Sequence, residues 1–333
     1  MSAGTAMKQI GDGVWASLWE PGGWGQANTG LVVDPGSVSM VIDTVWDVPR
    51  AREIADETAR LTANAPVTEA VNTHSDGDHW WGNDTLPSGV RITTSSASLH
   101  AMKEETAPAG VNAFAALGSR IGWVPGPLGA MGSYMNRVRG GAQFPGKSPR
   151  LPDHTFDVTE KITVGSRDVQ LRYLGPAHTV GDLIAHVPDA GIVFTGDLLF
   201  IGSTPILWHG PLGNWLGALD HLLSLDAEAY VPGHGPLCGT AEIRALREYW
   251  IWVEESGRQH FDAGVESTPA SRNMMQSKEF ERFSTWDCAE RLVLTMSTLY
   301  RLWEGKPAEP PTLARRARAF ADAGTFLREF ESR

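Results

Sequence analysis

The segment HSDGDH, residues 74–79, places two histidines and two aspartates in six positions. Three later segments each hold one further donor beside glycine: His178 in GPAHTVGD, Asp197 in FTGDLLF and His234 in VPGHGP. All of them fall at the ends of predicted strands, where loops present side chains to a shared point. These seven nitrogen and oxygen donors exceed what one tetrahedral zinc ion uses, but they suit two metal ions bridged by a carboxylate and a hydroxide about 3.5–4 Å apart. The sequence therefore predicts a dinuclear metal centre.

The spacing within HSDGDH divides its donors between the two predicted metal ions. Residues two apart in an extended segment point to the same side, so His74 and Asp76 can face one ion. Asp78 and His79 are adjacent in a predicted turn, and their side chains can diverge toward the second ion.

The elements that must position these donors are strands mixed with helices. Short strands in the N-terminal part are followed by a helix over residues 48–61 and by the strand TEAVNT, which leads into the first motif. Strands resume in KITVGSRDVQLRYLG and DLIAHVPDAGIVFTGD, and the strand AYVPGHG follows a helical stretch near NWLGALDHLLSL. From about residue 240 the pattern is mainly helical. This order predicts an α/β sandwich over residues 1–240, with residues 241–333 as a helical C-terminal extension packed on the same domain.

Residues 106–150 differ in composition from the rest of this domain. They contain nine glycines, five prolines and no acidic residue, which predicts a long loop or a lid with short helices rather than core structure. They also carry five cations: Arg120, Arg137, Arg139, Lys147 and Arg150. This basic insert is interpreted either as a solvated lid or as a docking surface for an anionic substrate such as a carboxylate, coenzyme A or an acyl-carrier protein.

Charge and composition exclude several classes of protein. A formal net charge of -11 argues against nucleic acid or an anionic membrane as a partner, because both favour a basic surface. Two cysteines, Cys238 and Cys288, are too few for a disulfide framework or a thiolate zinc site. The N-terminal segment has no basic region followed by an apolar run, and no stretch of about 18 uncharged apolar residues occurs. We therefore expect a soluble, cytoplasmic protein.

The donor motifs, in this order, resemble those of the metallo-β-lactamase-fold superfamily. That family's first motif, an aspartate ending a strand, matches Asp43 in MVIDT, and its HxHxDH loop matches HSDGDH. Its later histidine, aspartate and histidine match His178, Asp197 and His234. The resemblance runs from residue 43 to residue 234 and implies a four-layer αββα sandwich.

The resemblance also implies a set of metal ligands. His74, His178 and whatever residue 76 provides would hold the first ion, and Asp78, His79 and His234 would hold the second, with Asp197 bridging. By family, the two divalent ions would be zinc.

Asp76 departs from the commonest family pattern, which has histidine there. If Asp76 ligates, a third carboxylate makes the site more anionic and favours iron or manganese over zinc, a pattern similar to that of the superfamily's di-iron members. If Asp76 is too short, only the second ion is tightly bound. As a third alternative, Asp76 accepts a hydrogen bond from a ligand histidine.

Five residues outside the ligand set are also candidates for the site. Asp43 and Asp182 are expected to hydrogen-bond the ligand loops. Trp80, Trp81 and His209 are candidates for the substrate pocket, although the two tryptophans could instead pack the metal loop against the sandwich.

These features favour a metal-dependent hydrolase that cleaves an ester, thioester or lactone with a metal-bound hydroxide, in which the catalytic Asp78 or Asp197 orients the nucleophile. Its substrate would be a small molecule or an acyl thioester, and the basic insert offers a place for an anionic one. One alternative is a non-haem di-iron redox enzyme on the same fold, although the chain shows no iron–sulfur cysteine set for an electron partner. Another is a non-catalytic binding protein with a degenerate metal site. The oligomeric state is left open.

Overall fold

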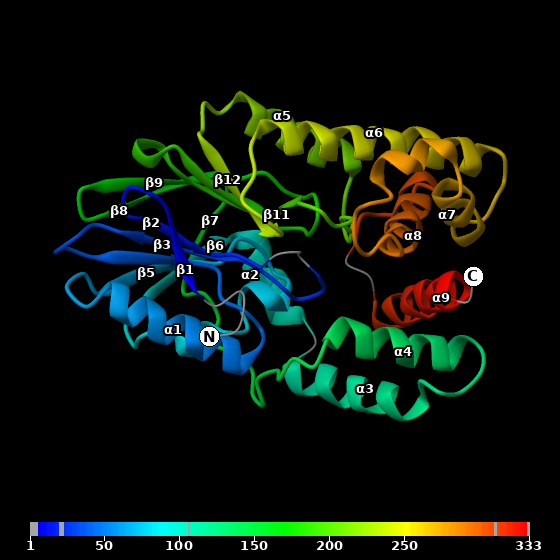
Figure 1. Cartoon of the computed structure of the whole chain (residues 1–333), viewed down its shortest axis with the longest axis horizontal. Coiled ribbons are helices and arrows are strands. Elements are labelled where there is room, and N and C mark those ends of the chain that lie inside the picture. The colour runs from blue at the N-terminus through cyan, green and yellow to red at the C-terminus, as the bar shows by residue number, and fades with distance from the viewer. Residues whose placement is uncertain (1–5, 20–22, 106, 310–311, 332–333) are drawn as a thin grey trace.

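The structure is a computed structural model that describes residues 6–19, 23–105, 107–309 and 312–331. Two β-sheets lie face to face between helices (Figure 1). The larger sheet holds seven strands in chain order: β1 (Met7–Gly11), β2 (Val14–Ser17), β3 (Thr29–Val33), β4 (Ser39–Ile42), β5 (Val67–Val71), β6 (Arg91–Ser95) and β7 (His154–Phe156). Its first four strands are antiparallel, and β4 to β7 run parallel.

The smaller sheet holds five strands in the spatial order β12 (Ala229–His234), β11 (Ile192–Phe200), β10 (Leu183–Val187), β9 (Arg167–Tyr173) and β8 (Thr159–Val164). Only the β11–β12 pair is parallel. Alternate side chains of the two sheets meet in one apolar core, to which β4 contributes Met40 and Ile42 and β9 contributes Val169 and Leu171.

Helices cover the outer face of each sheet, which completes the four layers of the predicted sandwich. Helix α1 (Val48–Leu61) packs Ala51 and Ile54 on the larger sheet, and its predicted bounds are confirmed. Asp47 caps its first turn by accepting a hydrogen bond from the backbone N–H of Arg50. On the smaller sheet lie α5 (Leu212–Ser224) and α6 (Thr240–Asp262), whose Trp215 and Trp250 are fully buried. Helix α2 (Ser96–Glu104) follows β6 directly.

The basic insert is not a long loop with short helices, so that expectation was wrong. After residue 106, which lies outside the described residues, it forms α3 (Pro108–Ile121) and α4 (Pro127–Arg139), of 14 and 13 residues, and Tyr134 of α4 is buried. Its glycines are the reason for the error, because they serve helix packing. A Cβ on Gly132 would lie 2.5 Å from the carbonyl oxygen of Gly118, so these positions let α3 and α4 approach closely.

The C-terminal extension is helical, as expected, with α7 (Ser267–Met275), α8 (Arg291–Trp303) and α9 (Leu313–Glu331) following α6. Helix α9 lies beside α4 (Figure 1), where a Cβ on Gly324 would meet the carbonyl oxygen of Ala130 at 2.2 Å. Arg328 of α9 donates to Ser133 Oγ at 2.9 Å, which further ties the extension to the insert. None of the helices in the described part of the chain has the length and apolar character of a membrane span.

Candidate metal centre

The predicted donors come together at one edge of the sandwich, and each sheet supplies part of the set. The loop after β5 carries His74 to His79 and closes with a short 3-10 turn, η1 (Gly77–His79). His178 follows β9, Asp197 lies within β11 and His234 ends β12. All of these donors are buried except Asp76, whose side chain is 25% exposed.

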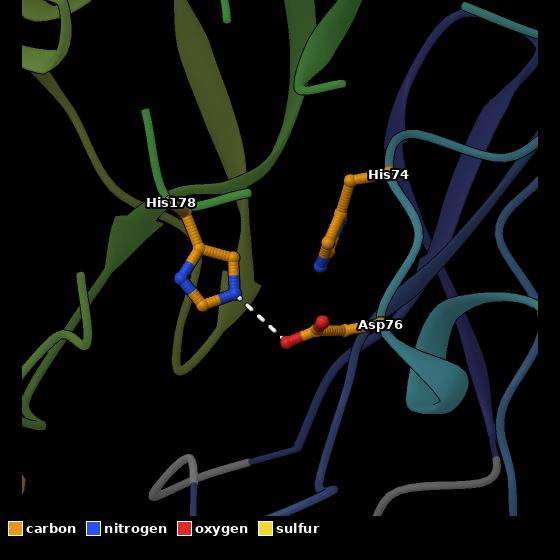
Figure 2. A group of neighbouring side chains, drawn as sticks. All are labelled: His74, Asp76 and His178. Atoms are coloured by element: carbon orange, nitrogen blue, oxygen red, sulfur yellow. Dashed lines mark hydrogen bonds and ion pairs between the residues drawn. The ribbon is translucent and has the colours of Figure 1, made fainter. Parts of the chain in front are cut away.

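The donor atoms form three overlapping groups in which the atoms lie within 4.8 Å of one another. Figure 2 shows the first, where His74, Asp76 and His178 point toward a common centre. The other two are His74, His79 and Asp197, and Asp78, His79 and His234. His74 and Asp76 thus share one group, Asp78 and His79 share another, and His74 and His79 meet in the third.

Asp197 lies in the middle of this arrangement. Its Oδ1 is 3.1 Å from His79 Nε2, and its Oδ2 is 3.2 Å from His178 Nε2 and 3.3 Å from His234 Nε2. His74 Nε2 lies 3.7 Å from the same Oδ2. One carboxylate thus faces all four imidazoles. The preceding Gly196 has φ of 51°, and a Cβ there would lie 2.5 Å from Thr73 Oγ1, so glycine is required where this strand approaches the metal loop.

Asp43 orients two of the histidines. Its Oδ2 accepts a hydrogen bond from His79 Nδ1 at 2.8 Å and another from Thr73 Oγ1 at 2.7 Å. Because the threonine hydroxyl donates to Asp43, it accepts from His74 Nδ1, 3.0 Å away. Both imidazoles consequently turn Nε2, with its lone pair, toward the centre, which is how a carboxylate typically fixes a ligand histidine.

The imidazole of His178 also turns its Nε2 toward the centre. Its Nδ1 donates to the carbonyl oxygen of Ile206 at 2.7 Å, which leaves Nε2 for the centre. Asp182 holds the loop that carries His178, because its carboxylate accepts from the backbone N–H groups of Ala177 and Thr179 and, at 2.7 Å, from the Thr179 hydroxyl. The positions expected for Asp43 and Asp182 beside the ligand loops are those found.

Three inward atoms of this cluster are buried without a hydrogen bond: His74 Nε2, His79 Nε2 and Asp197 Oδ1. A buried polar atom without a partner is costly, and such atoms call for an ion or water. Imidazole nitrogens and carboxylate oxygens are the donors that zinc, iron and manganese accept in proteins. The residues present therefore fit a divalent metal ion.

The buried histidines and aspartates of the cluster change one another's pKa values. Burial disfavours ionisation of Asp197, yet His234, His79 and His74 outweigh it and hold the pKa of that carboxyl well below its usual range. Burial likewise opposes a charge on His79, but Asp197 and Asp43 raise its pKa well above the ordinary value. The site therefore holds Asp197 as a carboxylate, the form that binds a metal ion.

The aromatic and histidine candidates for the substrate pocket are buried. Trp81 packs against Trp46 and Phe144, with ring centroids 6.1 and 5.3 Å apart, and Trp80 donates its indole N–H to the carbonyl oxygen of Ser75 at 2.9 Å. His209 donates its backbone N–H to the carbonyl oxygen of His178 at 3.2 Å. The side chains of Trp80 and Trp81 thus pack beside the metal loop, and His209 holds the loop of His178 through its backbone.

Two residues near the site were not found from the sequence, Glu105 at the end of α2 and Arg316 on α9. Glu105 Oε2 is buried without a hydrogen bond. Burial, and then the charge of Asp76, raises the pKa of Glu105 to about 8, against the opposing effect of Arg316. Both residues reach the site from elements distant in sequence, and no local motif surrounds either of them.

Comparison with known proteins identifies the family. The family model of the metallo-beta-lactamase superfamily matches residues 22–234. The chain belongs to the metallo-beta-lactamase superfamily. The matched residues include every donor of the site and end at His234. The fold class inferred from the motifs is thereby confirmed.

Individual members of the superfamily resemble the chain at low identity. The 2,4-dinitroanisole O-demethylase subunit alpha of Nocardioides sp. (strain JS1661) is 24% identical over 71% of this chain and 61% of its own length. A hydroxyacylglutathione hydrolase of Synechococcus sp. (strain JA-3-3Ab) is 31% identical over 31% of this chain and 40% of its own. The chain thus spans less than two thirds of either relative.

Among solved structures, a stereoselective inverting sec-alkylsulfatase from Pseudomonas sp. superposes with a TM-score of 0.68 at 14% identity, covering 90% of this chain and 50% of the sulfatase. This likeness concerns the fold and extends over most of the helical extension. Two of these similar proteins are named as hydrolases, the hydroxyacylglutathione hydrolase and the sec-alkylsulfatase.

Proposed function

We propose that the protein is a metal-dependent hydrolase that cleaves an ester, thioester or lactone. The observation that carries this proposal is the convergence of four inward Nε2 atoms and three carboxylates on a buried centre with unpartnered donor atoms. Such a donor set would hold a divalent ion, which would supply Lewis-acid polarisation of a carbonyl oxygen and lower the pKa of a water toward about 7.

The geometry supports a definite assignment of ligands. His74, Asp76 and His178 would hold one ion, Asp78, His79 and His234 the other, and Asp197 would contribute to both. Asp76 Oδ2 lies 3.1 Å from His178 Nε2, the nitrogen that also faces Asp197, while His178 Nδ1 is engaged with Ile206. An aspartate supporting a ligand histidine would instead face the nitrogen that turns away from the metal. Asp76 is therefore proposed as a ligand rather than as a support.

Two carboxylates of the protein would position and deprotonate the attacking water. Asp78 Oδ2 lies 3.4 Å from His234 Nε2, and burial raises the pKa of Asp78. We assign to Asp78 the acceptance of a proton from the attacking water and to Asp197 the fixing of the donor set around it. Hydrolysis then breaks the acyl bond to the leaving oxygen or sulfur, and the proton passes to that leaving group.

The relatives support cleavage of a bond to oxygen or sulfur in an organic substrate. One is named for demethylation of the oxygen of 2,4-dinitroanisole, another for hydrolysis of hydroxyacylglutathione, and the sulfatase for alkyl sulfates. The bond type in this protein is proposed from the superfamily and from the reactions for which these relatives are named, with esters and acyl thioesters as first substrates.

A di-iron redox enzyme is the second candidate, favoured by one observation. Three carboxylates, Asp76, Asp78 and Asp197, converge on the centre. Anionic oxygen ligands favour iron or manganese relative to zinc. The metal bound on purification separates the two functions before any assay.

The test combines metal analysis with turnover. Protein purified without added metal is analysed for zinc, iron and manganese per chain, then assayed with 4-nitrophenyl acetate and an acyl thioester after loading with zinc or manganese. We expect about two ions per chain and turnover that Asp197→Asn lowers at least 100-fold. Asp226→Asn, a change at an exposed aspartate after α5, is the control. Loaded protein that cleaves neither substrate would contradict the proposal, and two irons per chain with visible colour would favour the redox enzyme.

A further inference from the structure

A strongly basic pocket lies between α8 and α9, beside the metal centre. Three arginines line it: Arg301 from α8, and Arg315 and Arg316 from α9. Ser297 and Thr298 of α8 add hydroxyl groups, and Trp208 forms one wall. Glu309 is the acidic residue among the lining side chains, and its Oε2 lies 4.0 Å from Arg315 Nη2.

Positive charge is concentrated at this pocket. Arg315 and Arg316 occupy the first turn of α9, where the helix dipole is positive, and the first turn contains no acidic residue. Burial, and then the nearby charge of Arg301, lowers the pKa of Arg315. The three guanidinium groups and the N-terminus of α9 favour an anion in the pocket, although Glu309, Asp76 and Glu105 offset part of their charge.

The pocket is joined to the metal centre through Trp208 and Arg316. The backbone N–H of Trp208 donates to the carbonyl oxygen of His178, a proposed ligand, at 3.0 Å. The Arg316 guanidinium lies over the Trp208 ring, 5.5 Å from its centroid, and Arg316 Nε is buried without a hydrogen bond. The charge of Arg316 also acts on Asp76 and Glu105. The pocket therefore adjoins the segment that carries His178.

We propose that this pocket binds an oxyanion of the substrate, a carboxylate, sulfate or phosphate, while the scissile bond lies at the metal centre. Guanidinium groups and hydroxyls match the several acceptor oxygens of such a group, and arginine binds them in a two-pronged geometry. Arg316 would then be a residue that determines specificity. Naming the anion as part of a substrate rests on the proposed hydrolase function, whereas anion binding by the pocket does not.

The kinetic test uses two chromogenic esters of matched length, the 4-nitrophenyl monoester of glutarate, which is anionic, and 4-nitrophenyl pentanoate, which is neutral. Arg316→Ala and Arg301→Ala are each expected to raise the KM of the glutarate ester about tenfold, the typical loss for one charge-assisted hydrogen bond. The ratio of kcat/KM for the glutarate ester to kcat/KM for the pentanoate ester should therefore fall about tenfold in both variants. Arg318→Ala, at an exposed arginine on the same helix, is the matched control and should leave both esters unchanged.

A binding measurement separates this proposal from the proposed function. Calorimetric titration of the metal-loaded protein with glutarate and with inorganic phosphate should show a site whose affinity falls about tenfold in Arg316→Ala and Arg301→Ala but not in Arg318→Ala. If neither ester is turned over and this pattern still holds, the hydrolase proposal fails and the anion pocket stands. Two results would overturn the pocket proposal: both arginine variants bind the anions as tightly as the unmodified protein does, or both lose kcat equally for the two esters. Either result would mean that Arg316 only balances the charge of Asp76 and Glu105.

Discussion

Asp43 lies behind the metal centre, where it holds His79 directly and His74 through Thr73. Its φ of 57° is in the left-handed region, where asparagine is also tolerated. The backbone therefore accepts Asp43→Asn, and the change acts mainly on the hydrogen bonds of one carboxylate.

We expect Asp43→Asn to weaken metal binding about 10- to 100-fold, because the amide replaces one acceptor oxygen by a donor and frees the histidines to change orientation. Competition with a chromophoric chelator measures this affinity. Far-ultraviolet circular dichroism controls for folding. Unchanged affinity in a folded variant would show that Asp43 does not position these histidines.

The buried carboxyl group of Glu105 should make the free energy of unfolding fall as the pH rises. Its pKa is raised from 4.5 to about 8 by burial and by Asp76, so the folded chain binds this proton more tightly than the unfolded chain does. The stabilising contribution is complete below about pH 4.5 and is lost as the pH rises through 8.

Glu105→Gln keeps the neutral form at every pH. We expect it to raise the Tm at pH 8.5 by roughly 1–2 °C, the shift that about 1 kcal/mol gives in a chain of this size. At pH 5 the two Tm values should agree. Equal Tm changes at both pH values would show that the carboxyl group does not titrate as inferred. Differential scanning calorimetry at matched ionic strength gives both numbers.

At the scale of elements, the packing of α3, α4 and α9 depends on glycine. Gly132 lies in the middle of α4, and a side chain there would collide with the backbone of Gly118 on α3. Gly217 lies in α5 with no atom within 4 Å of an added Cβ. The two positions allow the same substitution to be compared in opposite surroundings.

We predict opposite signs for these two glycine-to-alanine changes. Gly132→Ala should lower the free energy of unfolding by about 1–3 kcal/mol through overpacking. Gly217→Ala should raise it by roughly 0.5–1 kcal/mol, because alanine loses less backbone entropy in a helix. Urea unfolding followed by circular dichroism measures both. Stabilisation by Gly132→Ala would mean that α3 and α4 can separate without cost.

The ligand loops could be read from the sequence, and the insert could not. Each proposed ligand lies in a short motif at the end of a strand, so the sequence alone was enough to predict the set: His74 to His79, His178, Asp197 and His234. The glycines of residues 106–150 resemble loop residues because their use, close contact between helices, depends on partners elsewhere in the chain. Glu105 and Arg316 were missed for the same reason, since only the tertiary fold brings them to the site.

At the scale of the whole molecule, the metal centre connects the two sheets. The larger sheet supplies the donors after β5, and the smaller sheet supplies His178, Asp197 and His234. A bound ion therefore stabilises the sandwich as a unit, because the unfolded chain does not assemble these donors.

Removal of metal should consequently lower the Tm. A ligand present at about 100 times its Kd contributes roughly 2.7 kcal/mol, which corresponds to a fall of about 4 °C in a chain of this size. Thermal unfolding with and without a chelator measures the shift. The variant Asp197→Asn should be nearly insensitive to chelation, and a shift of full size in that variant would show that the ion binds elsewhere.

The position of α9 along the chain also bears on the order in which the site is made. All proposed ligands precede residue 235, whereas α9, which carries Arg315 and Arg316, begins at Leu313, 79 residues after His234. At typical synthesis rates of 5–20 residues per second, this separation amounts to about 4–16 s. A nascent chain therefore possesses a complete set of metal donors before it possesses the basic wall beside them. Metal can therefore be acquired during translation, before α9 is in place.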